Sequence, residues 1–259
     1  MALVNLTTLF GGINPLQNTN VAHTNSRGSE HISTFNFEGL EPSRDKFSTN
    51  PFKDNFKTKA EIEQLAKSNP RIMAILKEYN IPLEVNITAL EHLKNGHLSD
   101  VRVLAAKIYS SLPEELKSEV NSTNLQQAAM LHDYGKVLIP KKILNKEHKL
   151  TSEEKNIMDL HSELGYELLK QQGVNEEVLN LVKYHHQKPD GSGYPAIDNN
   201  IEYSISSQIL TAADKYSALT EHRCYRKAYD KEKALQILQL DVEDGTISQE
   251  VFDALKKCL

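Results

Sequence analysis

The sequence predicts an all-α protein. From Thr58 onward the apolar pattern is helical and runs almost to the C-terminus. Alternating, β-branched patterns typical of strands are nearly absent, and the VLIP run at 137–140 is too short to count as one. No internal repeat is visible, and 259 residues are enough for one large domain, or for a domain with an appendage.

Residues 1–57 predict an N-terminal extension of low order. They are rich in Asn, Ser, Thr, Gly and Phe, show no sustained period, and include the loop-like runs FGGINPLQNTN and TNSRGSEH. Three interpretations stay open: a segment that binds a protein partner, a tail without function, and a segment that docks on the main domain through Phe10, Phe35, Phe37 and Phe47.

A helical lead-in segment is predicted over 58–94. Thr58 is suited to cap the run KAEIEQLAKS, and Pro70 suits the first turn of RIMAILKEYN. The helical part at 58–80 is a candidate dimer interface.

The main domain is predicted over 95–259. Thr151 followed by Glu154 is a capping box, which opens a helix that includes His161. The helical patterns of this domain fall at 98–112, 122–134, 151–172, 176–187, 203–220, 230–240 and 246–257.

Composition and charge exclude several classes of function. Charged residues make up 25% and the hydrophobic set 39%, as in ordinary globular domains. The formal net charge is −5, so no strong positive field favours long nucleic acid or an anionic membrane. No apolar run is long enough to span a membrane, the N-terminus lacks a signal peptide's basic region, and two cysteines make no disulfide framework. We expect a cytoplasmic protein.

A set of imidazoles and carboxylates predicts a metal centre. A zinc site closes with four ligands, so this set exceeds what one metal needs. A carboxylate able to bridge favours two metals about 3.5–4 Å apart, an arrangement that hydrolyses phosphate esters. The candidate ligands are His97, His132, Asp133, His161, His185, His186 and Asp214.

The His132-Asp133 pair follows an apolar helix turn in AAMLHDYGKV, where Gly135 is suited to end the helix. A buried His and Asp at a helix end are costly unless they are paired or bind metal. Asp214 interrupts the apolar run ILTAAD and needs a cation for the same reason. His161 is expected in mid-helix, with Gly165 on the same face leaving room for a close approach.

The His185-His186 pair opens the run HHQKPDGSGYP. Adjacent histidines at a helix end diverge, and both reach one site if that site lies past the terminus. Gly191 and Gly193 permit a tight loop that displays Tyr194.

These motifs resemble the HD-GYP family of cyclic di-GMP phosphodiesterases, within the HD superfamily of metal-dependent phosphohydrolases. The resemblance covers roughly residues 95 to 240. It is carried, in order and spacing, by HDYGKVLIPKKIL at 132–144, LTSEEKNIMDLHSELGYELL at 150–169, HHQKPDGSGYP at 185–195 and AADKYSALTEHRCYRKA at 212–228. It implies an HD-domain helical bundle with a dinuclear metal site in its core.

The resemblance also implies roles for individual residues. One metal falls to His97, His132, Asp133 and Asp214, and the other to Asp133, His161, His185 and His186. Lys136 would contact the scissile phosphate. Tyr194, Arg223 and Arg226 match substrate-binding positions, although Arg223 and Arg226 also fit a solvated charged face.

The residues and the resemblance together predict a reaction. Two divalent transition-metal ions would share Asp133 and a bridging hydroxide, which would attack phosphorus in line with the 3′ oxygen, and that oxygen would leave. His-rich ligation favours Fe or Mn, with Zn, Ni and Co as alternatives. The implied substrate is cyclic di-GMP and the product pGpG, with GMP as a further candidate.

The sequence departs from the family at several positions. Leu93 stands where some members carry a glutamate for a third metal, so we predict two metals. Ser217, Gln208 and Gln187 replace the family's usual Asp, Arg and Glu. Two other functions therefore stay open: a cyclic dinucleotide-binding signalling module with weak or no catalysis, and an HD phosphohydrolase acting on another nucleotide.

Overall fold

The structure, a computed structural model, describes residues 55–95, 97–196, 203–221 and 227–259. For residues 94, 95 and 97–99 it describes the backbone alone. All of these residues belong to one compact unit, Thr49–Leu259. The N-terminal extension, apart from residues 55–57, lies outside the described residues, and its division from the lead-in segment stays a prediction.

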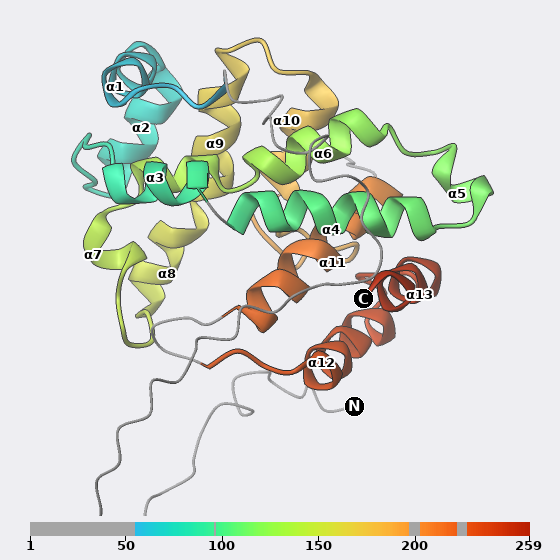
Figure 1. The fold of residues 1–259 in the computed structure, drawn as a ribbon. Helices are drawn as coiled ribbons and strands as arrows, with labels where there is room; N and C mark the ends of the chain where they lie inside the picture. Colours follow the sequence, from blue (N-terminus) through green and yellow to red (C-terminus); the bar gives the residue numbers. More distant parts are fainter. Residues whose placement is uncertain (1–54, 96, 197–202, 222–226) are drawn as a thin grey trace, which may run out of the picture. The chain divides into compact units, whose positions relative to one another are not determined.

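The described chain is built from helices and contains no strand, which confirms the all-α prediction (Figure 1). The elements in order are α1 (Lys59–Ser68), α2 (Pro70–Glu78), α3 (Ile87–Asn95), α4 (His97–Ser111), α5 (Glu114–Lys117), α6 (Ser122–Leu131), the 3-10 helix η4 (Tyr134–Leu138), α7 (Lys141–Leu144), α8 (Ser152–Asp159), α9 (His161–Lys170), α10 (Glu176–Tyr184), α11 (Ile205–Thr220), α12 (Lys231–Glu243) and α13 (Gln249–Cys258).

Helix α4 runs through the middle of the bundle and packs against α6, α11 and α13. A second group joins η4 to α9, and α9 to α10, which in turn packs on α6. The core between these helices is aliphatic, because each turns a stripe of Leu, Ile, Val and Ala inward. Four helix segments therefore meet in one region: the ends of α6 and α10, the start of α9 and the middle of α11.

The predicted helix starts are present. Thr58 and Thr151 each form a complete capping box, with Glu61 and Glu154 as the reciprocal partners. Asn69 caps α2, and Pro70 occupies its first turn. These caps satisfy backbone N–H groups that would otherwise lack partners at the helix start.

Several predicted helix boundaries were wrong. The helix predicted over 176–187 ends at Tyr184, before the histidine pair, and the one predicted over 246–257 begins at Gln249. The helix predicted over 122–134 ends at Leu131, because the chain tightens into η4 and places Gly135 within that 3-10 helix. The helix predicted over 151–172 breaks at Leu160 into α8 and α9. His161 is consequently the first residue of α9 and not a mid-helix residue.

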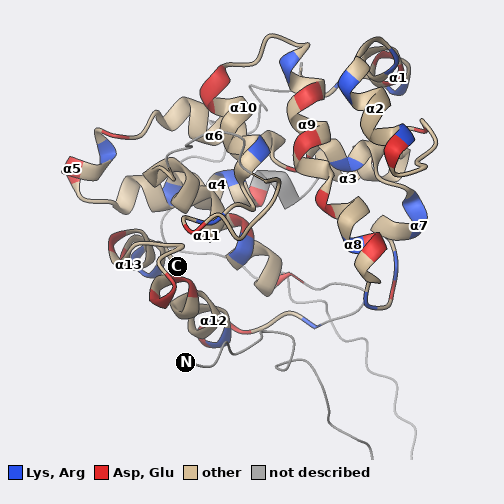
Figure 2. Cartoon of the chain, turned by 180° about the vertical axis from the view of Figure 1, so that it is seen from behind, with Lys and Arg blue, Asp and Glu red and all other residues tan. Residues whose placement is uncertain are grey.

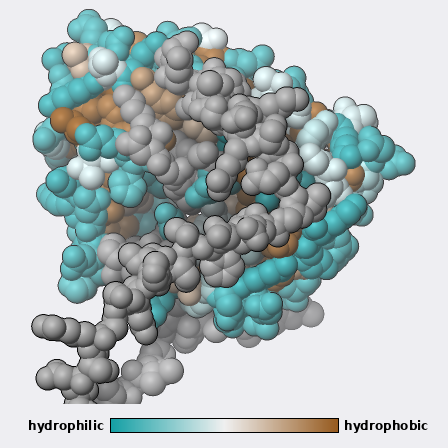
Figure 3. All heavy atoms as spheres, viewed as in Figure 1, coloured by the Kyte–Doolittle hydropathy of each residue, from teal (hydrophilic) through white to brown (hydrophobic). Residues whose placement is uncertain are grey.

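Charged residues of both signs are interspersed over the described helices, in keeping with the modest net charge (Figure 2). Hydrophilic residues also dominate the described part of the face in Figure 3. Within the described residues, no helix is long and apolar enough to cross a membrane.

Candidate metal centre

The HD turn joins the end of α6 to η4 and is buried. His132 is the C-cap of α6, and Asp133 is the residue before η4. The side chain of His132 is inaccessible to solvent, and Asp133 is 5% exposed. The preceding turn, residues 128–131, is buried and apolar, so it draws both polar side chains into the core. A buried imidazole and carboxylate need compensating partners.

Three buried histidines are oriented in the same way by the backbone. In each, Nδ1 lies against the carbonyl oxygen of the residue three positions earlier: His132 at 2.9 Å from Ala129, His161 at 2.7 Å from Met158, and His185 at 2.7 Å from Val182. A carbonyl oxygen can only accept, so Nδ1 carries the hydrogen and the Nε2 lone pair of the neutral ring is free for a cation. This backbone contact is typical of metal-binding histidines.

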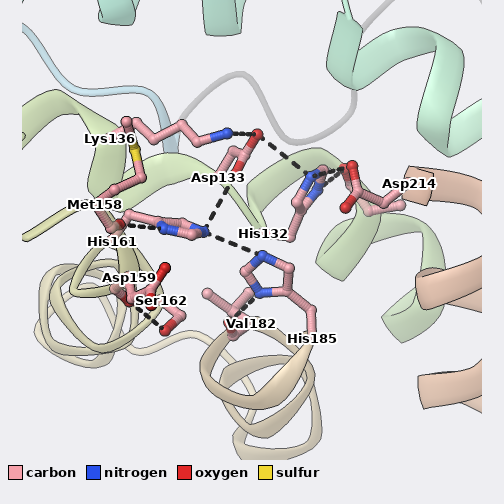
Figure 4. A network of polar contacts seen from close by, with 11 residues as sticks. His132, Asp133, Lys136, Met158, Asp159, His161, Ser162, Val182, His185 and Asp214 are labelled. Carbon is pink, nitrogen blue, oxygen red and sulfur yellow. Dashed lines mark hydrogen bonds and ion pairs between the residues drawn. The ribbon is translucent and has the colours of Figure 1, made fainter. Parts of the chain in front are cut away.

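The Nε2 atoms converge on Asp133 and Asp214 (Figure 4). His161 Nε2 lies 3.2 Å from His185 Nε2 and 3.4 Å from Asp133 Oδ1. His132 Nε2 lies 3.5 Å from Asp133 Oδ2 and 3.5 Å from Asp214 Oδ1, yet it is buried without a hydrogen-bond partner. The Nε2 lone pairs of His161 and His185 face each other, and that of His132 lies among carboxylates without a hydrogen-bond partner. Cations between these atoms would satisfy all three lone pairs.

His186 extends the group toward the protein surface. Its ring lies 4.0 Å from that of His185 and 5.1 Å from that of His161, centroid to centroid. Two sets have ligand atoms close enough to share a metal: His161, His185 and His186, and His132, Asp133 and His185. The donor atoms, their burial and their orientation therefore fit divalent metal ions.

Burial keeps His161, His185 and His186 neutral and available as ligands. It lowers the pKa of His161 to about 4 and that of His186 to about 3, and it lowers the pKa of His185 well below its ordinary value. Burial acts on His132 in the same direction, but Asp133 and Asp214 outweigh it and raise that pKa. A metal ion binds imidazole in its neutral form, so low pKa values favour binding near neutral pH.

Asp133 is held as a carboxylate. Burial alone would raise its pKa, but the Lys136 ammonium, with His132 and His161, holds that pKa well below the usual range. Lys136 Nζ lies 2.6 Å from Asp133 Oδ2, and its side chain is 28% exposed. The site thus combines a buried anionic ligand with a cation at its solvent edge.

Tyr194 stands beside the histidines. Its ring lies 4.8 Å from that of His186 and is tilted by 33°, and it meets the ring of His161 edge-on at 6.2 Å. Lys155 Nζ lies 5.1 Å from the centroid of the Tyr194 ring. Burial, together with Asp159, raises the pKa of the phenol, so Tyr194 stays protonated and can donate a hydrogen bond.

Most residues predicted for the site lie together, and the side chains of the other three lie outside the described part of the structure. Arg223 and Arg226 lie outside the described residues, and the side chain of His97, the first residue of α4, is also outside them. The described set comprises His132, Asp133, Lys136, His161, His185, His186, Tyr194 and Asp214. Leu93 is a buried core residue of α3.

Sequence reasoning missed the residues that support Tyr194. Lys155 and Asp159 form an ion pair on α8, one turn apart, and both act on Tyr194. Their i, i+4 spacing is visible in the sequence but is common on exposed helices. Gln187 was noted only as a departure from the family, whereas it is buried at the base of the Tyr194 loop.

Comparison with known proteins gives a family match and several relatives. Residues 82–250 match the family model described as HD domain. The chain is 32% identical over 224 residues to 3'3'-cGAMP-specific phosphodiesterase 3 of Vibrio cholerae, covering 76% of this chain and 48% of that protein.

Two further relatives are named for cyclic di-GMP. A cyclic di-GMP phosphodiesterase of Thermotoga maritima is 37% identical, over 54% of this chain and 38% of its own. The cyclic di-GMP phosphodiesterase response regulator RpfG of Xanthomonas campestris is 38% identical, over 47% of this chain and 32% of its own. The chain thus spans less than half the length of each of these three relatives.

Proposed function

We propose that this chain, which belongs to the HD domain family, is a metal-dependent phosphodiesterase that hydrolyses cyclic di-GMP to pGpG, with GMP as a further product. One observation supports this above the others. Buried imidazole Nε2 atoms converge with the Asp133 and Asp214 carboxylates at distances of 3.2–3.5 Å, and His132 Nε2 has no hydrogen-bond partner there.

Two divalent ions are proposed as the cofactors, because the donor set is larger than one ion needs and Asp133 has two oxygens facing different histidines. His132, Asp133 and Asp214, with His97, would hold one ion, and Asp133, His161, His185 and His186 the other. Imidazole-rich ligation favours Fe or Mn over Mg. When bound, such ions supply Lewis acidity and a nucleophile at neutral pH by lowering the pKa of water.

The chain's own residues bind and orient the phosphate. Lys136 stands at the solvent edge of the buried ligands, where its ammonium can neutralise charge that develops on the phosphoryl oxygens. Tyr194, protonated and packed on His186, offers a hydroxyl and a ring face to the nucleotide. Asp133 stays anionic, because Lys136 and the neighbouring histidines hold its pKa well below the usual range.

Hydrolysis of 3'3'-cGAMP is a second candidate activity. The relative specific for it matches 76% of this chain, a larger share than either relative named for cyclic di-GMP. The two substrates differ in one base, and the described ligands act on the phosphate. We further propose that the protein works in the cytoplasm, that the N-terminal extension binds a protein partner, and that residues 58–80 are a candidate dimer contact.

The test is turnover by the full chain. Anaerobically purified protein is incubated with Mn²⁺ or Fe²⁺ and either cyclic di-GMP or 3'3'-cGAMP, and products are separated by chromatography. We expect wild type to form the linear dinucleotide and His132→Ala to be inactive. His148→Ala, which changes an exposed histidine, is the matched control and should keep full turnover. Binding of cyclic di-GMP without turnover would favour a receptor. Absence of both binding and turnover would refute the proposed substrate.

A further inference from the structure

We infer that Gln187 is a positioning residue that holds Tyr194 over His186. The inference rests on the proposed function, in which Tyr194 contacts the nucleotide. Gln187 directly follows the histidine pair and is 3% exposed, although it belongs to a loop between helices. A buried polar side chain in a loop needs partners for both its donor and its acceptor.

Both ends of the Gln187 amide bind the backbone of the loop. Its Oε1 accepts from Gly193 N at 2.7 Å and from Lys188 N at 2.9 Å, and its Nε2 donates to Pro195 O at 2.8 Å. Gly193 and Pro195 flank Tyr194 in the sequence. The amide therefore fixes the backbone on both sides of the residue whose ring lies on His186.

The backbone of the loop that carries Tyr194 lies very close to His186 and Gln187. Tyr194 N donates to His186 O at 3.3 Å, which makes an isolated antiparallel bridge between a candidate ligand and the tyrosine. A Cβ on Gly193 would lie 2.2 Å from His186 O and 2.7 Å from Gln187 Oε1. Glycine at 193 is thus required for the backbone to reach the amide.

A second tether of the loop is weaker. Lys188 Nζ lies 2.9 Å from Asp244 Oδ2 at the end of α12, but these side chains are 39% and 44% exposed. Water and salt screen an ion pair of that exposure, whereas the Gln187 bonds are shielded. The loop's position therefore depends on Gln187 more than on Lys188.

An amide suits this position better than a carboxylate. Glutamate at 187 would accept from the same two N–H groups but would place an oxygen against Pro195 O, with no hydrogen to donate. Where the family usually has Glu, this chain has an amide that ties Tyr194 on both sides. Gln187→Glu should accordingly keep part of the effect, and Gln187→Leu none.

The first test is a kinetic double-mutant cycle with Gln187→Leu, Tyr194→Ala and the double variant, assayed with cyclic di-GMP and Mn²⁺. We expect Gln187→Leu to raise KM about tenfold, which converts to ~1.4 kcal/mol, with little change in kcat. It should add nothing in the Tyr194→Ala background, because it acts through that ring. Gln187→Glu should restore part of the loss. Independent, additive effects would overturn the inference.

A second readout does not need turnover. Hydrogen exchange of the Gly193 and Tyr194 amides should be at least tenfold faster in Gln187→Leu than in wild type, with metal content unchanged. Gln171→Leu is the matched control, since its amide also joins a backbone carbonyl, Leu65 O at 3.1 Å, at the far end of α9. Unchanged exchange would overturn the positioning role. Inactive wild type with faster exchange would refute the proposed function alone.

Discussion

Replacing Gly135 by alanine tests the packing that brings the HD turn against His161. A Cβ built on Gly135 would lie 1.9 Å from His161 O and 2.5 Å from Gly165 N, both backbone atoms. Ordinary contact begins at 3.4 Å, so η4 and α9 must separate by about 1.5 Å, the difference between 3.4 and 1.9. Rigid backbone on both sides puts the cost at the upper end of overpacking, ~3 kcal/mol.

The same movement should reach the metal site. Asp133 precedes η4 and His161 begins α9, and their facing atoms, Oδ1 and Nε2, lie 3.4 Å apart. Separating the two elements spreads these candidate ligands. We expect metal affinity to fall by roughly 10- to 100-fold, as for other changes that misorient ligands.

The assay pairs urea unfolding of the metal-free protein with a metal titration of the same sample. Gly165→Ala is the matched control: its Cβ would meet Gly135 N at 3.1 Å, so the neighbour must give by only a few tenths of an ångström. An added methyl in helix α9 also gains up to ~1 kcal/mol of helix propensity, so this variant should be near wild type. Equal stability of Gly135→Ala and Gly165→Ala would refute the reasoning.

Three further predictions concern charge. Burial depresses the pKa of His161 from 6.5 to about 4, so the unfolded chain binds more protons in that window. This residue alone should cost the metal-free protein up to ~3 kcal/mol as pH falls from about 6.5 to about 4, and the lowered pKa values of His185 and His186 act in the same direction. A flat urea midpoint would contradict this. Lys136→Met should lower turnover roughly 10²-fold while metal stays bound, with exposed Lys142→Met as control; equal rates for the two would exclude the role given to Lys136. Lys215→Met leaves the buried Asp241 carboxylate, 2.6 Å away, without its nearest cation. Because the Lys215 side chain is 38% exposed, the cost should fall below that of a fully buried pair, at ~2 kcal/mol. Burial already raises the pKa of Asp241, so this loss should be larger at pH 8 than at pH 5, and a loss independent of pH would argue against it.

Helical periodicity was sufficient to predict the fold class and most of the helices, because burial of one apolar stripe leaves a pattern in the sequence. The break at Leu160 is not visible in that pattern, since both α8 and α9 continue the helical spacing. It depends on the contact between α9 and η4, where Gly135 meets Gly165. The close approach expected at Gly165 is present, and its partner is Gly135. The sequence predicts Gly135 at a helix end, whereas it lies within η4.

The candidate ligands could be found from residue type and motif order, whereas their electrostatics could not. The neutral state of His161 and His185 follows from burial, and the orientation of their rings follows from carbonyl oxygens three residues earlier, so both depend on how the helices pack. The two-sided role of Gln187 likewise depends on the path of the loop around it. The resemblance to the HD-GYP family, in contrast, is confirmed by the family match and the named relatives.

The most direct test of the metal-dependent phosphodiesterase is to measure metal content and turnover in the same samples. The full chain is stripped with a chelator, reloaded stepwise with Mn²⁺ and assayed with cyclic di-GMP beside Asp133→Ala. We predict that turnover rises with metal content and saturates at two ions per chain, and that Asp133→Ala retains neither ion tightly. Turnover by metal-free protein, or three tightly held ions, would contradict the account.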